Sequence, residues 1–389
     1  MPQHRQRIIA LNYASFLTLG LGSSAIGPSL PKLAGQTGVG LDAAGGLVSS
    51  LSAGYMIAGL TAGPLADVLG RRPVYLVALA TQALGLLAIV AIPDLATGLL
   101  VAFLLGLGQG SIDISSHVVT GDVVGEERGA ALNRLHLFYG AGALIGPALA
   151  GYGLDALDSL WAAFAPIAAL TLLIALGVAF TPLSVHTPTH KSAASNAKAV
   201  IGSRTFWALA VFFFLYVGVE VGVGTWTFAF LSEGLATEVT LASWATSGFY
   251  LALTASRLIG SRLAGRRVAD EKLVLLSIGG ATAGALLLWT AGASAATPML
   301  IIAVLLVGFC FGPVYPTTMG VAQQRHAEAI GTTVGLLTMG AGLGATSVPW
   351  LQGWLLTRGG LPWGAAATAI GTLALLAVAI VAIPQRIKR

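Results

Sequence analysis

Long apolar stretches without a charged side chain follow one another along this chain. Between Lys272 and Arg325 no Asp, Glu, Lys or Arg occurs. This interval is more than twice the roughly 20 apolar residues that a helix needs to cross a bilayer. Near its middle, residues 291–298 are rich in Gly, Ser, Thr and Pro, a composition that predicts a turn. The interval therefore predicts two membrane-spanning helices joined by a short loop.

The same pattern extends over the whole sequence and predicts an all-α membrane protein with twelve transmembrane helices in two six-helix halves. The longest polar stretch, 183–203, is expected to be a cytoplasmic central loop. It separates an N-terminal half, 1–182, from a C-terminal half, 204–389. The twelve spans are expected near 8–29, 43–64, 74–93, 96–119, 131–152, 160–181, 205–230, 241–263, 273–291, 298–318, 330–351 and 362–383.

Composition and charge support this class and add an orientation. Hydrophobic residues make up 56% of the chain and charged residues 9%, whereas soluble domains are roughly 45–50% apolar. The 51 glycines suit close helix packing in lipid. Lys and Arg gather on alternate loops, and the opposite loops hold only Lys32 and Arg358. Because basic residues favour the cytoplasmic side, we expect a multi-pass protein of the cytoplasmic membrane with both termini cytoplasmic.

A charged motif follows the second span. Residues 63–72 read G-P-L-A-D-V-L-G-R-R, which places Asp67 close to Arg71 and Arg72, and a carboxylate there can accept charge-assisted hydrogen bonds from arginine. The motif resembles the signature of the major facilitator superfamily, and a second copy at 260–267 has Gly265 in place of the acid. The resemblance implies the major facilitator fold, a central cavity exposed alternately to either side, and a gating role for these three residues.

Asp113 lies well inside the fourth span, where a carboxylate costs at least about 2.5 kcal/mol unless it faces protein or water. Gln109, Asp113 and His117 are four residues apart and share one helix face. A carboxylate removed from water binds a proton more readily, so the pattern predicts a proton-coupling site at Asp113. The alternative is a structural acid that pairs with a neighbouring helix.

His136 opens the fifth span beside Asn133 and Tyr139. Counted along the two helices, Asp113 and His136 both lie roughly 8–9 Å below the same membrane face, so the two side chains are expected to meet. An imidazole next to an acid favours the charged pair, which predicts a coupling role for His136. A histidine that merely bonds between helices is the alternative.

Glu220 is the second buried acid, in the seventh span, and glycines on either side of it predict that this helix bends or breaks. Trp226 and Trp244 are expected either to stack on a sugar or an aromatic drug or to anchor the protein at the membrane interface. Arg257 lies inside the eighth span and needs a partner, for which Asp113, Glu220 and a substrate carboxylate are the candidates.

Two branches of the superfamily remain open. Residues 142–151 read G-A-L-I-G-P-A-L-A-G and resemble the span-5 motif of drug/proton antiporters, although span 4 lacks the arginine usual there. The acid of span 4, the Asn/His-bearing start of span 5 and E-x5-W at 220–226 resemble the fucose permease-like branch of sugar:proton symporters, which often has asparagine where His117 stands. Such symporters tend to carry an acid in span 1, where this chain offers Asn12 and Tyr13.

We therefore favour a secondary active transporter that moves a sugar or similar polar solute by alternating access, coupled to protons. The alternative is a drug/proton antiporter that exports amphipathic or cationic compounds. An enzyme is not expected, because no H-E-x-x-H, G-x-S-x-G or phosphate-cradling motif occurs. The proposed proton-coupling residues are Asp113, His136 and Glu220.

The expected partners are a small-molecule substrate, protons and membrane lipids, with no cofactor, no metal, no nucleic acid and a monomeric chain. Hydrogen-bonding and aromatic side chains within the spans are the candidates for binding the substrate. They are Asn12, Tyr13, Gln109, His117, Asn133, Tyr139, Tyr216, Glu220, Trp226, Tyr250, Arg257 and Tyr315, with Gln352 as a further cavity residue.

Overall fold

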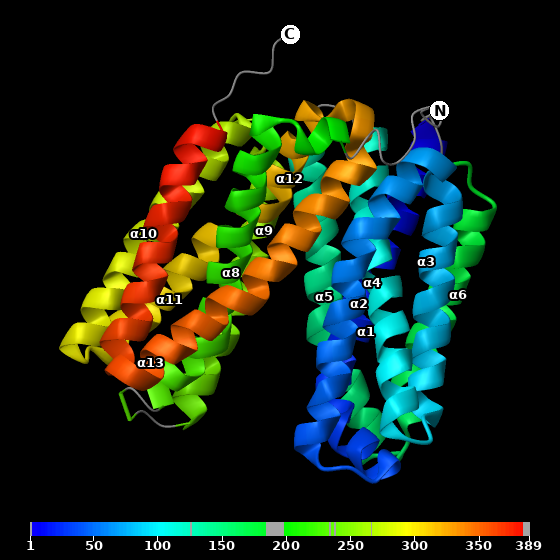
Figure 1. Cartoon of the computed structure of the whole chain (residues 1–389), viewed down its shortest axis with the longest axis horizontal. Coiled ribbons are helices and arrows are strands. Elements are labelled where there is room, and N and C mark those ends of the chain that lie inside the picture. Colours follow the sequence, from blue (N-terminus) through cyan, green and yellow to red (C-terminus); the bar gives the residue numbers. More distant parts are fainter. Residues whose placement is uncertain are drawn as a thin grey trace. The chain divides into compact units, whose positions relative to one another are not determined.

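A computed structural model describes residues 2–124, 127–183, 198–232, 235–236, 239–265 and 267–383 of the chain (Figure 1). Nearly all of these residues are helical, and the one isolated β-bridge in this part pairs Ala264 with Val268. In chain order the elements are α1 (Pro2–Thr37), α2 (Leu41–Leu69), α3 (Arg71–Ala88), the 3-10 turn η1 (Ile89–Ala91), α4 (Leu95–Val124), α5 (Arg128–Asp155), α6 (Leu160–Ala179), α8 (Arg204–Ser232), α9 (Val239–Leu263), α10 (Asp270–Ser294), α11 (Thr297–Phe311), α12 (Val314–Arg325), η3 (Ala327–Ala329) and α13 (Ile330–Ala382).

The twelve predicted spans all fall on helical parts of the chain. Ten helical segments of the described chain are long and apolar enough to cross a membrane, and α2 and α9 stand at the positions predicted for spans 2 and 8. The all-α fold with twelve spans is thereby confirmed.

The predicted spans 11 and 12 both lie in α13, which turns back at Gly360. This glycine has φ 68° and ψ −168° inside an otherwise helical segment, a backbone conformation that glycine adopts without steric cost. Just before the turn, the Arg358 guanidinium lies 4.3 Å from the centre of the Trp354 ring. Two helices separated by a glycine turn therefore occupy the region predicted for two spans.

Two helices differ from the sequence-based expectation. The predicted tenth span, 298–318, consists of α11 and α12 because Pro313 has no N–H to continue the helical ladder. The sequence predicts that span 7 bends or breaks. The predicted break is wrong, because α8 is helical from Arg204 to Ser232. Its glycines instead provide room for α13. A Cβ on Gly218 would lie 2.5 Å from Val348, and one on Gly222 would overlap Gln352.

The chain divides into two compact units, which are not the same as the two predicted halves. The boundary between the units falls within two helices. The start of α5, up to Arg134, belongs to unit 2, and the start of α13, up to Met339, belongs to unit 1. Residues 184–197 of the predicted central loop 183–203 lie outside the described residues. Unit 1 comprises Met1–Gly125, Leu135–Val200 and His326–Met339, and unit 2 comprises Glu126–Arg134, Ile201–Arg325 and Gly340–Arg389.

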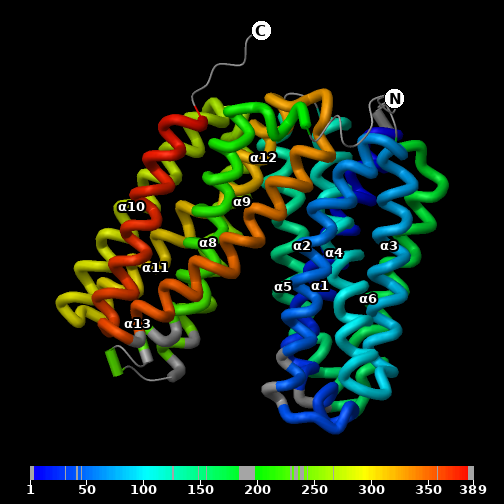
Figure 2. The backbone as a smooth tube through the Cα atoms, in the orientation of Figure 1, coloured from blue at the N-terminus to red at the C-terminus, as the bar shows by residue number. Residues whose placement is uncertain are grey.

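In unit 1, glycines allow the helices to pack at very short range. A Cβ on Gly54 of α2 would lie 1.9 Å from the Phe103 carbonyl oxygen, and one on Gly106 of α4 would lie 1.9 Å from that of Leu51. Close backbone approach of this kind stabilises helix pairs in lipid. Figure 2 traces α2, α3, α4 and α6 side by side, with a core that includes Leu86, Leu105 and Phe164.

In unit 2, α11 packs against α10 and α9. α8 packs closely against α13, since a Cβ on Gly344 would lie 2.0 Å from the Phe214 carbonyl oxygen. The end of α13 is fastened by a side chain. The Arg325 guanidinium, at the end of α12, donates hydrogen bonds to the carbonyl oxygens of Ala382 and Ile383. A cation at this position satisfies carbonyls that a helix end leaves unpaired.

Candidate transport site and gating network

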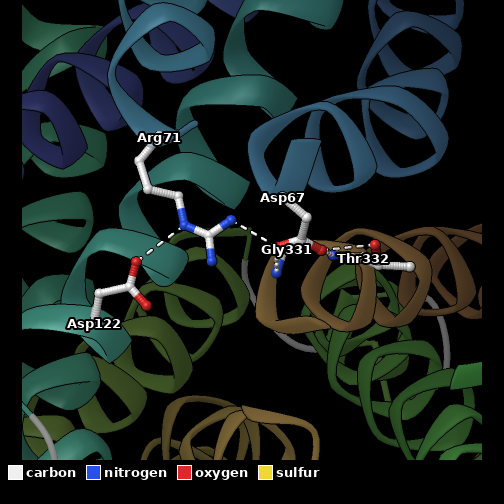
Figure 3. A network of polar contacts seen from close by, with 5 residues as sticks. All are labelled: Asp67, Arg71, Asp122, Gly331 and Thr332. Atoms are coloured by element: carbon white, nitrogen blue, oxygen red, sulfur yellow. Dashed lines mark hydrogen bonds and ion pairs between the residues drawn. The ribbon is translucent and has the colours of Figure 1, made fainter. Parts of the chain in front are cut away.

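The motif that follows α2 forms a buried charged network in unit 1 (Figure 3). Nη1 of Arg71 donates to Oδ1 of Asp67 at 2.6 Å, and Nε of Arg71 donates to Oδ2 of Asp122 at 3.0 Å. Asp67 and Arg71 are 0% and 2% exposed, whereas Arg72 is exposed. Paired carboxylates thus flank Arg71 and satisfy much of the hydrogen bonding that a buried guanidinium requires.

Asp67 also caps the N-terminus of α13. Its carboxylate accepts hydrogen bonds from the backbone N–H of Gly331 at 3.0 Å, and from the N–H and hydroxyl of Thr332, both at 2.7 Å. An acid at this end of a helix is favoured by the unpaired N–H groups and by the helix dipole. Gly63 and Gly331 permit the close approach, since a Cβ on Gly63 would lie 2.0 Å from the Gly331 carbonyl oxygen.

Sequence reasoning found the Asp67–Arg71 pair and missed its other members. Asp122 carried a signal, because it is a second acid on α4, after Asp113 and close to the end of the helix. Gly331 and Thr332 carried none, since their contribution is a pair of backbone N–H groups and a hydroxyl from a helix more than 250 residues further along the chain.

The second copy of the motif, after α9, is built differently. Arg262 and Arg267 are exposed, and Arg266 lies outside the described residues. Gly265, in place of the acid, has φ +65°. Nearby, Asp270 at the start of α10 is 8% exposed, and its Oδ2 lies 2.8 Å from the position that a Cβ would take on Gly129, near the beginning of α5. An acid thus lies close to the start of a helix here as well, although the motif itself has lost it.

Asp113 lies in a buried cluster with two histidines in unit 1. His117 Nδ1 is 2.8 Å from the backbone oxygen of Asp113 and 3.4 Å from its Oδ1. His117 Nε2 is 3.1 Å from Nε2 of His136. Asp113, His117 and His136 are 5%, 0% and 9% exposed. The expected approach of span 4 to His136 is therefore present, but His117 stands between His136 and the acid.

Aromatic rings surround this cluster. Phe16 of α1 makes edge contacts with His117 and His136, at ring-centre distances of 5.5 and 5.3 Å, and with Tyr139 at 6.2 Å. Tyr13 stacks on Phe138 at 4.7 Å. Gln109, one turn before Asp113 on α4, is buried, and its Nε2 has no hydrogen-bond partner within the described residues.

The two candidate asparagines are occupied in contacts between helices. Asn12 Nδ2 donates to the Ser116 carbonyl and the Thr120 hydroxyl, and Asn12 Oδ1 accepts from the Tyr75 hydroxyl at 2.8 Å. Asn133, in unit 2, donates to the Gly129 carbonyl and to the Thr317 hydroxyl at 2.9 Å.

In unit 2, Glu220 lies near the buried Arg257. Glu220 Oε1 is 3.9 Å from Nη2 of Arg257, and Nε of Arg257 donates to the Gly312 carbonyl at 3.3 Å. Tyr216 lies one turn before Glu220 on α8 and donates its hydroxyl to the Phe311 carbonyl. Its ring centre is 6.3 Å from that of Tyr315. Of the three partners considered for Arg257, the structure places Glu220 beside it.

The remaining candidates lie in different surroundings. The Trp226 indole donates to the Pro349 carbonyl at 2.8 Å, and its ring covers Gly353 of α13. Gln352 donates to the Thr368 hydroxyl. Tyr250 and Trp244 of α9 are 51% and 72% exposed. An exposed Trp244 fits the alternative of interfacial anchoring better than stacking on a substrate.

The described residues thus bring the polar candidates together in two clusters. We call Asp113, His117 and His136 the acid–histidine cluster, and Tyr216, Glu220 and Arg257 the acid–arginine cluster. Within the described residues, no group of three or more His, Cys, Asp and Glu side chains could hold a metal ion.

Comparison with known sequence families agrees with this architecture. The sequence profile of the Major Facilitator Superfamily matches residues 13–329 and 224–388. The chain therefore belongs to the Major Facilitator Superfamily, and it is a multi-pass membrane transporter rather than an enzyme.

Similar proteins come from several organisms. The sodium-dependent glucose transporter 1 of Danio rerio is 25% identical over 380 residues, which cover 88% of this chain and 63% of that relative. The multidrug transporter protein MdtP of Bacillus subtilis is 31% identical over 163 residues, 40% of this chain and 28% of that one. The crystal structure of FucP in the outward conformation has a TM-score of 0.83 and 19% identity, with 96% and 98% of the two chains covered. A variant of the E. coli fucose:proton symporter FucP has a TM-score of 0.80 and 19% identity, with 96% and 98% covered.

Proposed function

We propose that this protein carries a sugar or a similar polar solute across the cytoplasmic membrane by alternating access, coupled to protons. The observation that carries the proposal is the buried carboxyl of Asp113, set against His117 and, through it, His136. Asp and His side chains within membrane spans commonly form proton relays in pumps and transporters.

The choice of a sugar rests on relatives and on the site. Both the glucose transporter and FucP are described as handling a sugar. In this chain, Gln109, Tyr216 and Glu220 offer hydrogen-bonding groups, and Trp226 offers a flat aromatic surface for a sugar ring. The name of the Danio rerio relative also raises sodium as the coupling ion, so an experiment must separate the two cations.

The network around Asp67 is the proposed gate. It connects α2 to the first turn of α13. In the sequence, α2 belongs to the N-terminal half and α13 to the C-terminal half. In alternating access the halves 1–182 and 204–389 move against each other, joined by the loop 183–203. A buried carboxylate that caps a helix of the other half must be uncapped during that movement, so Asp67 and Arg71 are suited to set the balance between the two states. Both termini are proposed to be cytoplasmic, and the chain to act as a monomer.

Transport by purified protein in liposomes tests this function. Uptake of radiolabelled glucose and fucose is measured with an imposed proton gradient, with an imposed sodium gradient and with neither. We expect accumulation above the external concentration with the proton gradient. Accumulation driven by sodium alone would reject proton coupling, and the absence of any sugar exchange would reject the substrate class.

A drug/proton antiporter is the second candidate function. It is favoured by the match to the multidrug transporter of Bacillus subtilis and by the sequence at 142–151, in which Gly142 and Gly146 of α5 pack closely on α1. Titration of the purified protein with a panel of neutral sugars and a panel of cationic dyes separates the two. Dye binding that disappears in Glu220→Gln, with no response to sugars, would establish the antiporter instead.

A further inference from the structure

We propose that His117 and His136 bind one proton between them, shared across their Nε2 atoms, and that this shared proton is the one that the transport cycle loads and releases. The inference rests on the proposed proton-coupled function for its role in transport. The part that concerns how many protons the pair binds rests on geometry alone.

The hydrogen-bonding partners assign the tautomer of His117. Its Nδ1 lies 2.8 Å from the backbone oxygen of Asp113, an atom that only accepts hydrogen bonds, so Nδ1 carries a hydrogen. In neutral His117, Nε2 is then an acceptor. Because His136 Nε2 is 3.1 Å away, this atom must be the donor. One hydrogen therefore occupies the line between the two Nε2 atoms.

The same contact limits the charge of the pair. One added proton makes one ring an imidazolium, and the hydrogen between the rings still has an acceptor on the other side. A second proton would place an N–H on both rings, pointing at each other across 3.1 Å. Two positive charges would also stand side by side where both side chains are at most 9% exposed, an arrangement that burial makes very costly. The pair can therefore hold no charge or one, but not two.

The surroundings favour the singly charged form. From α4, Asp113 Oδ1 is 3.4 Å from Nδ1 of His117, so a carboxylate balances one imidazolium. From α5, Tyr139 contacts Phe16, which also touches both histidines. From α1, the pair meets the ring of Phe16, whose edge contacts reach both histidines. The Asp113 carboxylate and these aromatic rings suit one positive charge.

Counting bound protons tests the pair without any transport assay. Purified protein is titrated between about pH 8 and pH 5, the range in which histidine changes charge, and the protons taken up per chain are compared among variants. We expect His117→Gln and His136→Gln each to take up as many protons as the wild type, because the remaining histidine still binds one. The double variant His117→Gln, His136→Gln should take up one fewer.

Two independent histidines would give a different series, with one proton lost in each single variant and two in the double variant, and that result would overturn the proposal. An unchanged count in the double variant would overturn it as well. The matched control is His4→Gln, since His4 is exposed on α1 and should lose one proton by itself. Repeating the series in Asp113→Asn separates protons bound by the carboxyl, and size-exclusion chromatography with helix content by circular dichroism shows that each variant is folded.

The role in transport needs a second readout. In liposomes, we expect the double variant His117→Gln, His136→Gln to lose more than tenfold of the sugar accumulation driven by a pH gradient, measured relative to its own exchange of labelled sugar at equal pH. Variants that accumulate sugar like the wild type would overturn the coupling role while leaving the proposed sugar transport intact. If the wild type itself exchanges no sugar, the proposed function fails, and the proton count still decides whether the pair shares one proton.

Discussion

Asp113 and Glu220, the acids within the predicted spans 4 and 7, have partners of different chemical character. In the acid–histidine cluster of unit 1, Asp113 lies 3.4 Å from His117, which in turn contacts His136. In the acid–arginine cluster of unit 2, Glu220 lies 3.9 Å from Arg257. Histidine changes its charge between about pH 5 and pH 8, whereas arginine stays protonated.

The difference assigns different work to the two acids within the proposed mechanism. A cluster of a carboxyl and two imidazoles has the side-chain chemistry of a proton relay, which is what coupling requires. The charge of Arg257 does not change with pH, and a carboxylate is a strong acceptor for the hydroxyl groups of a ligand. We therefore place proton coupling at Asp113 and the histidines, and substrate binding at Glu220, although the sequence alone offered Glu220 for both roles.

Loss of the titratable acid has the largest expected effect on transport. Asp113→Asn keeps the size and hydrogen-bonding capacity of the side chain but cannot bind a proton. We expect sugar accumulation driven by a pH gradient to be abolished, while exchange of labelled sugar at equal pH continues. Wild-type accumulation by the variant would show that Asp113 is a structural acid, and the comparison between the two clusters would fail.

Glu220→Gln is the corresponding change in the other cluster. It removes the charge beside Arg257, and sugar binding should weaken by about 1–3 kcal/mol, the range for hydrogen bonds to charged groups. At saturating sugar the variant should still accumulate substrate with a proton gradient. Calorimetric titration gives the affinity, and liposome uptake gives the coupling. Full affinity together with lost coupling would reverse the roles of the two acids.

Asp67→Ala tests whether the gate is distinct from both clusters. The change removes the acceptor for Arg71 and for the backbone N–H groups of Gly331 and Thr332. We expect slower transport, unchanged proton coupling, and faster labelling of single cysteines placed along the cytoplasmic side of the cavity. Arg262→Ala, in the exposed second motif, is the matched control and should change neither rate by more than about twofold. Unchanged labelling with full activity in Asp67→Ala would reject the gate.

Trp226→Ala has the smallest expected effect of the four. The ring covers Gly353 and its N–H bonds to the Pro349 carbonyl, so α13 already holds part of it and only the remaining face is available to a ligand. We expect weaker sugar binding through lost stacking, by about 0.5–1.5 kcal/mol. Trp244→Ala, at an exposed position, should leave the affinity unchanged. Equal effects of both changes on affinity would indicate that Trp226 acts through the membrane interface rather than on the substrate.

The sequence predicted what local patterns control. Apolar intervals without charge predicted the twelve spans, and the charged motif after span 2 predicted that Asp67 accepts hydrogen bonds from arginine. Pairings between distant helices were not accessible in this way. The cap that Asp67 places on Gly331 depends on two backbone N–H groups, which no side-chain pattern reveals.

The same limit applies to the candidate site residues. His117 was predicted to bind the substrate because the sequence shows that it shares a helix face with Asp113. The sequence does not show that His136 lies next to it. Asn12 and Asn133 were polar groups within spans, and polar groups in lipid are satisfied as readily by a neighbouring helix as by a substrate. The glycines of α8 predicted a break because glycine weakens a helix, yet here they make room for Val348 and Gln352.

Proton flux on addition of sugar is the most direct test of the different roles of the two acids. Liposomes that contain the wild type, Asp113→Asn or Glu220→Gln are placed in a weakly buffered medium, saturating sugar is added, and the external pH is recorded. The proposed mechanism predicts alkalinisation of the medium by the wild type and by Glu220→Gln, and none by Asp113→Asn. Alkalinisation by Asp113→Asn equal to that of the wild type, or its loss in Glu220→Gln alone, would contradict it.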